Sequence, residues 1–461
     1  MNNRFEKRYG LFTAICMVVG IVIGSGIFFK AEEVLTDNGG SIPMSLLTVA
    51  SVGVLMLVCS YAFSLLASRY ERVGGFVDYA EGTCGEGYAY FAAWFSSTIH
   101  FPVISSTLAW ISARYIISLI NPSAVNSIYA YFLAIFIILA IMGLNIFAPK
   151  LSGIMQISTT LIKLIPLAVM AIAGTFIGLT NGNLSMPVLR EASTGTGDGF
   201  FGAVVAFAFA YDGWIIATCI NAELKNAKKN LPIALVTGAV IVVAVYLSYF
   251  WGISGALSTE QIMNANGDLP RIAFTSLFGG NALFGSLAYV FIIISCLGTT
   301  NGVMMANCRG FYSIAVRNQG PMPSKINRLS KKANMPVLSA IIGLCLTLLW
   351  LSQRQFCTVD RLLPDMFCFS NDELPIITLY AFYIPIFIRT MCICKDLNPF
   401  NRYVAPAAAI IACVFMMYAA IASYKIGVVH YLIVFTAIML IGALFYRSAD
   451  GKTAIDRLRK N

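Results

Sequence analysis

Charged residues are scarce in this sequence of 461 residues: they make up 11% of it, whereas hydrophobic residues make up 58%. Ordinary soluble domains carry roughly 25% charged residues, so a water-soluble protein of this size is excluded. Apolar runs of about 20 residues, long enough for a helix to cross the hydrocarbon of a bilayer, recur from end to end. We therefore expect the lipid bilayer to surround most of the chain.

Histidine is also nearly absent, since only His100 and His430 occur. Neither lies in an HExxH motif or a nucleophile elbow, and no P-loop is present, which argues against an enzyme and against ATP-driven pumping. Both histidines are expected to be packed or interfacial. Most of the 12 cysteines lie in apolar runs, where cysteine acts as a small hydrophobic residue rather than a zinc ligand. We expect no metal and no cofactor.

Twelve apolar runs separated by polar residues predict an all-α integral membrane protein with twelve transmembrane helices. The runs are 11–29, 43–67, 88–117, 128–147, 154–179, 200–220, 231–256, 282–316, 336–351, 367–388, 403–423 and 427–446. The first run is too long for the hydrophobic region of a signal peptide, so we expect it to be retained as a span. The chain 1–461 is then a single membrane domain.

The combined number of lysine and arginine residues alternates between high and low from one loop to the next. With a cytoplasmic N-terminus, the inner segments carry roughly three times as many of them as the outer segments. This bias predicts a multi-pass protein of the cell (plasma) membrane with both termini in the cytoplasm, a basic inner connection at 317–334 and an outer loop at 181–199. It also explains the net charge of +10 without a nucleic-acid partner.

Small residues in the first span predict a break in its helix. Gly24, Ser25 and Gly26 follow one another, and glycine permits non-helical backbone. The amides freed at such a break begin the next half-helix and favour an anion such as a carboxylate. The alternative is that Gly20 and Gly24 form a GxxxG face for close helix packing.

The sixth span contains an acidic residue about 18 Å from its start, Asp212, within the sequence FAYDGW. An ionisable residue at mid-membrane is a functional hypothesis by default. Asp212 either caps a half-helix that begins near Trp214 or contacts a substrate cation, and both interpretations require an interrupted helix. Breaks in spans one and six, the opening helices of two five-helix halves, are typical of a carrier with inverted repeats. A channel is disfavoured because nothing repeats like a selectivity filter.

Lys163 falls inside the fifth span, roughly 13 Å from the inner interface, which is far for a side chain to snorkel. We expect it to be buried against the bundle. There its ammonium would neutralise or replace a coupling cation.

These motifs together resemble the L-type amino acid transporters (LAT family) of the amino acid–polyamine–organocation (APC) superfamily. The similar segments extend along essentially the whole chain and are 24–28, 209–214, 221–226, 229–232, 298–302 and 372–375. The resemblance implies a LeuT-type fold with inverted repeats over 11–179 and 200–388 and two added helices over 403–446.

The resemblance also implies a binding site for an L-amino acid between the two breaks. The substrate-binding candidates are Val22, Ile23, Gly24, Ser25, Gly26, Phe209, Ala210, Tyr211 and Asp212. In this family the substrate carboxylate meets the amides of the first break, and the amino group meets carbonyls that match Val22, Phe209 and, as an open alternative, Asp212. The Phe209 ring is implied as a gate, and Lys163 and Asn301 are candidates for coupling or gating.

Family members are typically sodium-independent exchangers. We therefore expect exchange of small-to-medium neutral amino acids, of the alanine, serine, threonine and cysteine type, by alternating access. Proton symport stays open because Lys163 can titrate, and a cationic amino acid or polyamine substrate stays open because of Asp212.

Animal members of the family form a disulfide bond with a glycoprotein through a cysteine in the outer loop after span three. The corresponding loop, 118–127, has no cysteine, so we expect a stand-alone monomer without a disulfide-linked partner.

Overall fold

The computed structural model describes residues 7–70, 74–125, 127–185, 197–330, 332 and 334–447. Secondary structure in these ranges is helical, apart from an isolated parallel bridge between Tyr9 and Leu224. Most of the predicted outer loop 181–199, two positions of the basic connection 317–334 and the terminal residues 1–6 and 448–461 lie outside the described residues.

Within the described ranges, eleven helices are long and apolar enough to cross a membrane, and a bent pair of helices supplies a twelfth span. The spans are α1 (Leu11–Val22) with α2 (Gly26–Asp37); α3 (Ile42–Ala67); α5 (Glu86–Phe95), η1 (Ser96–His100) and α6 (Phe101–Ile120); α7 (Ile128–Phe147); α8 (Pro149–Val169), η3 (Met170–Gly174) and α9 (Thr175–Asn181); α11 (Gly197–Tyr211) and η4 (Trp214–Glu223); α12 (Ala227–Ala256); α15 (Ala282–Ala315); α17 (Val337–Arg354) and η5 (Gln355–Val359); α18 (Pro375–Ile393); η7 (Phe400–Val404) and α19 (Ala405–Tyr424); and α20 (Ile426–Phe445). The shorter elements are α4 (Phe76–Cys84), η2 (Pro122–Ala124), α13 (Thr259–Met263), α14 (Leu269–Leu277), α16 (Pro323–Ile326) and η6 (Asp365–Phe367).

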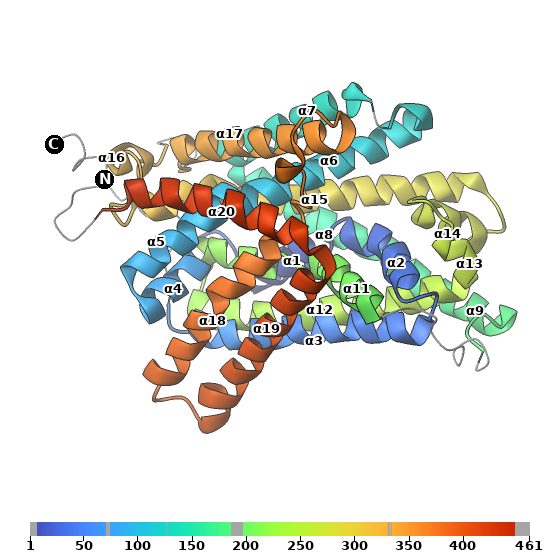
Figure 1. Cartoon of the computed structure of the whole chain (residues 1–461), viewed down its shortest axis with the longest axis horizontal. Coiled ribbons are helices and arrows are strands. Elements are labelled where there is room, and N and C mark those ends of the chain that lie inside the picture. The colour runs from blue at the N-terminus through green and yellow to red at the C-terminus, as the bar shows by residue number, and fades with distance from the viewer. Residues whose placement is uncertain are drawn as a thin grey trace.

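Most of the long helices run along the long axis of the molecule, and α18 and α19 cross it obliquely (Figure 1). α9, α13 and α14 lie at one end, and α4, α5 and α16 lie at the other. The start and the end of the described chain both contact segments at the second end. The amide of Lys225 donates to the carbonyl oxygen of Tyr9 at 2.8 Å, and the amide of Arg447 donates to Oε1 of Gln319 at 2.7 Å. The described chain therefore begins and ends on one side, as an even number of spans requires.

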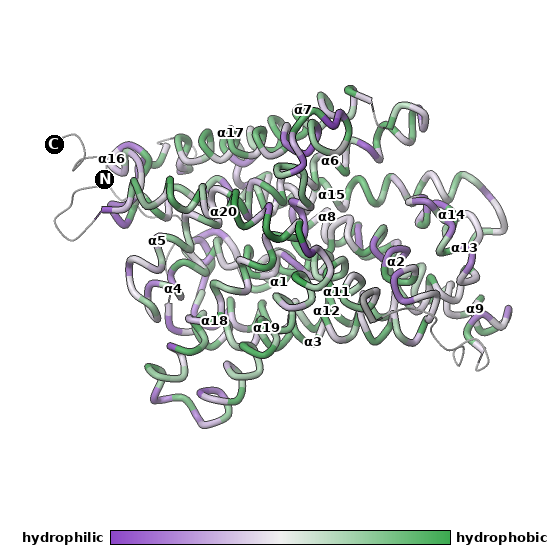
Figure 2. Tube along the Cα trace, viewed as in Figure 1, coloured by the Kyte–Doolittle hydropathy of each residue, from purple (hydrophilic) through white to green (hydrophobic). Residues whose placement is uncertain are grey.

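The outward faces of the helices are apolar. Phe136 on α7, Ile411 on α19 and Leu440 on α20 are each more than 60% exposed, and hydrophobic residues run along the length of α3 (Figure 2). A continuous apolar surface of this extent needs lipid around it. The chain is a multi-pass membrane protein.

The tenth span begins later than its hydropathy predicts, at Pro375 instead of residue 367. Proline suits the first turn of a helix because it lacks the amide that an interior turn requires. The residues before it form a loop that folds back on the end of α17. There, the side-chain amide of Asn371 donates to Oε1 of Gln353 at 2.6 Å.

Both predicted helix breaks are present. The axes of α1 and α2 differ by 42°. α11 ends at Tyr211, and Gly213 adopts a φ of 101°, a left-handed conformation that favours glycine, before the 3-10 helix η4 begins. Gly20 also allows close helix packing, which was the alternative interpretation of the glycines in this span. A Cβ atom at residue 20 would lie 2.1 Å from Oγ1 of Thr160 on α8. The first span therefore packs closely at Gly20 and breaks after Val22.

Candidate functional site

A small cavity lies where the two broken helices face each other. Seven of the residues predicted for substrate binding line it: Val22, Gly24, Ser25, Gly26, Phe209, Ala210 and Asp212. Six further residues line it: Ile21 and Gly213 beside the two breaks, and two pairs that were not predicted as wall residues, Ile104 and Leu108 on α6 and Thr299 and Val303 on α15. Each of these pairs is spaced four residues apart, which places both members on one helix face.

The start of α2 faces this cavity. Ser25 is the N-cap residue of α2, and Gly26 is its first residue. The first amides of a helix have no partner within it and carry the positive end of its dipole, so this position favours a carboxylate. A Cβ atom at Gly26 would lie 2.8 Å from Cα of Ala210, so the two breaks can touch only because residue 26 is glycine.

Lys163 lies beside the first break and is completely buried. Its ammonium donates to the carbonyl oxygens of Gly20 at 2.8 Å, Ile23 at 2.6 Å and Ser295 at 3.2 Å, and to Oγ1 of Thr299 at 3.0 Å. The first two oxygens belong to the C-terminal end of α1 and the break, where the helix dipole favours a cation. Lys163 does not line the cavity, but Thr299 contacts both. The expectation of a buried lysine is confirmed.

Tyr246 of α12 joins the two breaks. Its hydroxyl lies 3.0 Å from the carbonyl oxygen of Val22 and 2.9 Å from that of Ala210. The Val22 carbonyl, predicted to receive a substrate amino group, is therefore shared with this tyrosine. Sequence reasoning missed Tyr246 because a tyrosine in an apolar span gives no sign of which neighbour it meets.

Asp212 lies at the cavity wall with both carboxylate oxygens engaged. Oδ1 accepts from the amide of Gly213 at 2.7 Å, and Oδ2 lies 3.1 Å from Nε2 of His100. Because a carboxylate only accepts hydrogen bonds, His100 is the donor. His100 closes the π-helical turn η1, and such turns are frequent at functional sites. The structure thus gives His100 a place at the site that the sequence did not predict.

Three other predicted residues lie behind the cavity wall. Ile23 contributes its carbonyl to Lys163. The ring of Tyr211 packs on Tyr246, with ring centroids 4.9 Å apart. Asn301 belongs to a buried polar cluster that joins α7, α8 and α15. The bonds of that cluster are Asn145 Nδ2 to Asn301 Oδ1 at 3.1 Å, Ser152 Oγ to Asn301 Oδ1 at 2.9 Å and Asn301 Nδ2 to Gln156 Oε1 at 3.2 Å.

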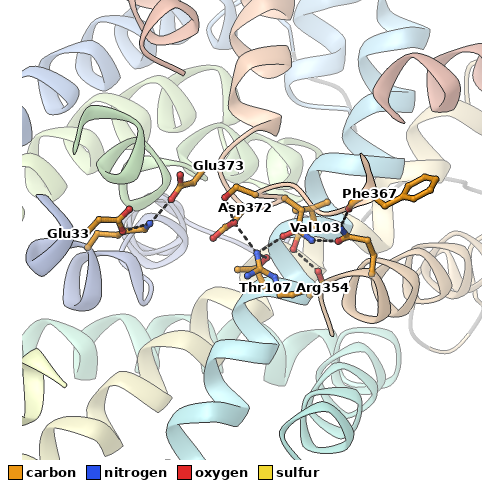
Figure 3. A network of polar contacts seen from close by, with 12 residues as sticks. Glu33, Val103, Thr107, Arg354, Phe367, Asp372 and Glu373 are labelled. Carbon is orange, nitrogen blue, oxygen red and sulfur yellow. Dashed lines mark hydrogen bonds and ion pairs between the residues drawn. The ribbon is translucent and has the colours of Figure 1, made fainter. Parts of the chain in front are cut away.

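Ion pairs join the elements on one side of the cavity. Lys30 of α2 contacts Glu373 in the loop before α18 at 2.5 Å. Arg354, at the end of α17, contacts Asp372 at 3.0 Å and donates to Thr107 of α6 at 3.1 Å. Figure 3 shows these two groups of contacts next to each other. We call these five residues the outer network.

A buried ion pair closes the opposite side. Arg309 of α15 donates to Oε1 of Glu223 from Nη2 at 2.5 Å and from Nε at 3.0 Å, and both side chains are almost inaccessible to solvent. The amide of Tyr9 adds a bond to the Glu223 carbonyl oxygen at 3.0 Å. Polar contacts therefore join the start of the described chain to the end of η4, and the end of η4 to α15.

Comparison with known proteins agrees with this architecture. The model of the amino acid permease family matches residues 9–454. The serine/threonine exchanger of Bacillus subtilis (strain 168) is 28% identical over 398 residues, which are 86% of this chain and 85% of that protein. The human cystine/glutamate transporter is 25% identical over 357 residues, which are 76% of this chain and 68% of that protein. The mouse b(0,+)-type amino acid transporter 1 is 28% identical over 349 residues, 73% and 68% of the two chains. The chain belongs to the amino acid permease family, as its resemblance to the L-type transporters predicted.

Proposed function

We propose that this protein exchanges small-to-medium neutral L-amino acids across the plasma membrane, by alternating access and without sodium. The observation that carries the proposal is the start of α2, which faces the second broken helix across a small cavity. Helix-terminal amides suit a carboxylate, and the carbonyls of an unwound segment suit an ammonium group. The relatives include a serine/threonine exchanger, which supports a substrate of this size.

The proposed binding roles follow from these positions. The amides of Gly24, Ser25 and Gly26 hold the carboxylate, and the carbonyl of Phe209 holds the ammonium together with that of Val22. The ring of Phe209, whose centroid lies 6.4 Å from that of Phe29, acts as the gate. The walls beside it are apolar branched side chains from α6 and α15, which favour an uncharged substrate side chain.

Sodium independence is proposed from the surroundings of Lys163. Three carbonyl oxygens and one hydroxyl lie within 3.2 Å of its ammonium. Oxygen clusters of this kind suit hard cations. The ammonium of a lysine held among these oxygens supplies a positive charge from the protein itself, so a coupled metal cation is not needed.

We further propose that 11–179 and 200–388 are inverted repeats and that both termini are cytoplasmic. The positions of the two breaks, each in the opening helix of its half, support the repeats. The excess of basic residues supports the orientation. On this orientation the outer network faces the cell exterior, and the protein acts as a monomer without a disulfide-linked partner.

Uptake into liposomes tests the proposal. Purified protein is given labelled alanine, serine, leucine or arginine, with and without internal amino acid, sodium and a pH gradient. Stimulation of alanine or serine uptake by internal amino acid alone is the expected result. Stimulation by external acid instead selects proton symport, and dependence on sodium contradicts the proposal. A pore would show no acceleration by substrate on the far side.

The His100–Asp212 contact predicts how the protein discriminates against cationic substrates. In the variant His100→Ala, Oδ2 of Asp212 loses its partner at the cavity wall. We expect the uptake of arginine relative to alanine to rise by roughly tenfold, the value of one charge-assisted hydrogen bond. The ratio of the two labelled uptakes measures this effect. Adding Asp212→Asn to the same variant should remove the gain, and a gain that persists would show that Asp212 is not responsible.

Tyr246→Phe is expected to slow exchange by about fivefold, because the bond that joins the two breaks is lost while the ring remains. Initial rates of alanine counterflow measure it. Tyr249→Phe is the matched control: this buried tyrosine lies on the same helix, and its hydroxyl has no hydrogen-bond partner among the described residues. Equal rates in the two variants would contradict a role for the Tyr246 bridge.

A further inference from the structure

The segment between α17 and α18 brings two thiols together. Cys357 lies in η5 and Cys368 directly follows η6. The Sγ atom of Cys357 donates to the carbonyl oxygen of Phe367, the residue before Cys368, at 3.3 Å. The thiol of Cys368 donates to the carbonyl oxygen of Leu363 at 3.5 Å, and the two thiols also contact each other.

These thiols lie beside the outer network. Both cysteines line one hollow together with Lys30, Arg354 and Glu373. The side-chain amide of Gln353 donates to the carbonyl oxygen of Phe367 at 2.6 Å, so the loop is already held against the end of α17. Figure 3 shows Phe367 and Arg354 in the same network of polar contacts. Cys357 is 8% exposed and Cys368 is partly exposed. A small water-soluble reagent in the hollow therefore reaches this pair.

A second thiol pair provides a contrast. Cys59 on α3 and Cys413 on α19 also contact each other, but both are completely buried between membrane helices. A hydrophilic oxidant has no route to that pair. The position of Cys357 and Cys368 at a hollow on the outer side, where disulfides persist, is what distinguishes them.

We propose that Cys357 and Cys368 form a reversible disulfide that regulates transport from the outer side. The inference rests on the proposed function and orientation. With a small disulfide such as oxidised glutathione as the oxidant, one cysteine thiolate attacks the reagent and releases one glutathione thiol. The second cysteine thiolate then attacks the mixed disulfide and releases the other glutathione. The two protons of the cysteine thiols end on the two glutathione molecules, and the protein disulfide is the oxidised product.

The new bond changes how the outer network moves. It closes the loop covalently a few residues before Asp372 and Glu373, so both carboxylates are fixed to the end of α17. Lys30 lies on α2, which moves relative to α17 if the outer side opens. A fixed Glu373 holds Lys30 more firmly and therefore favours the conformation in which the outer side of the protein is closed. Oxidation is therefore expected to slow exchange by about fivefold or more, the usual size of coupling between two sites.

The test uses the full-length protein in liposomes, treated with oxidised glutathione or with dithiothreitol. Free thiols are alkylated, and the digested protein is analysed by mass spectrometry while alanine exchange is measured in parallel. We expect a linked peptide containing Cys357 and Cys368, slower exchange, and recovery on reduction. Cys357→Ser and Cys368→Ser should each abolish the response, whereas Cys345→Ser, on the exposed surface of α17, should retain it.

The possible failures are distinguishable. Absence of the linked peptide in protein that still exchanges amino acids overturns the disulfide and leaves the proposed function intact. A linked peptide with unchanged exchange overturns the regulatory role. Absence of exchange in the reduced protein contradicts the proposed function, whereas mass spectrometry still reports on the bond. Labelling of Cys368 in intact cells by a membrane-impermeant thiol reagent is expected, and labelling only after permeabilisation would overturn the outer location.

Discussion

Replacing Lys163 by alanine is expected to reduce amino acid exchange by at least about 100-fold while the protein still reaches the membrane. The variant removes a buried ammonium from the carbonyl oxygens of Gly20 and Ile23 at the first break and of Ser295 on α15. A hydrogen bond to a charged group contributes about 1.5–3 kcal/mol, and the loss of two such bonds accounts for a factor of this size. Counterflow of labelled alanine in liposomes, normalised to the amount of reconstituted protein, measures the loss.

Lys150→Ala provides the control, because this lysine lies on the same helix with an exposed side chain. It should exchange at the normal rate. Near-normal exchange in Lys163→Ala would refute the proposed role of the buried ammonium. Partial recovery of Lys163→Ala by external sodium would support it, since a small cation would then occupy the oxygens that the lysine left.

Glu223→Gln is expected to lower the stability of the protein by about 3–5 kcal/mol. The guanidinium of Arg309 then stays buried without its counter-charge, which is the most costly way to disrupt a buried ion pair. Thermal unfolding in detergent, followed by fluorescence-detected size-exclusion chromatography, should show a clear fall in the midpoint temperature. The double variant Glu223→Gln with Arg309→Met should recover most of the loss, because both charges are then gone.

Asp396→Asn removes one partner of the exposed pair between Arg69 and Asp396. A surface ion pair contributes little to stability because water and salt screen it, so this variant should unfold close to the normal temperature. If Glu223→Gln behaved like Asp396→Asn, the buried Arg309–Glu223 pair would not contribute to stability as its burial predicts.

The sequence was sufficient to predict the spans and both breaks, for a physical reason. A bilayer requires long apolar helices, so hydropathy alone locates them. The sequence around Gly24 stood out because consecutive small residues permit non-helical backbone. The FAYDGW segment stood out because an acidic residue is costly at mid-membrane. Lys163 was found by the same reasoning, since a single charge in a span must have partners.

Other parts of the site depend on which helix faces surround the cavity, and hydropathy contains no such information. Ile104 and Leu108 differ in no visible way from other apolar residues of α6. His100 was expected to be packed or interfacial, yet it closes η1 with its ring nitrogen next to the carboxylate of Asp212. Asn301 was recognised within a family-like segment, but its position in a polar cluster behind the cavity wall could not be predicted from the sequence. The start of α18 was misplaced because the loop before it begins with three apolar residues, 367–369, that resemble the start of a span.

The direct contact between Gly26 and Ala210 has a consequence for how selectivity can evolve in this protein. At that junction the groups that meet the zwitterion on our proposal are peptide groups, and every residue type has the same ones. Point mutations therefore leave recognition of the common part of an amino acid nearly constant. On our proposal, a change of substrate selectivity therefore requires a change in the wall residues, such as Ile104, Leu108 and Val303. There, the addition or loss of one methyl group alters the size of the substrate side chain that fits.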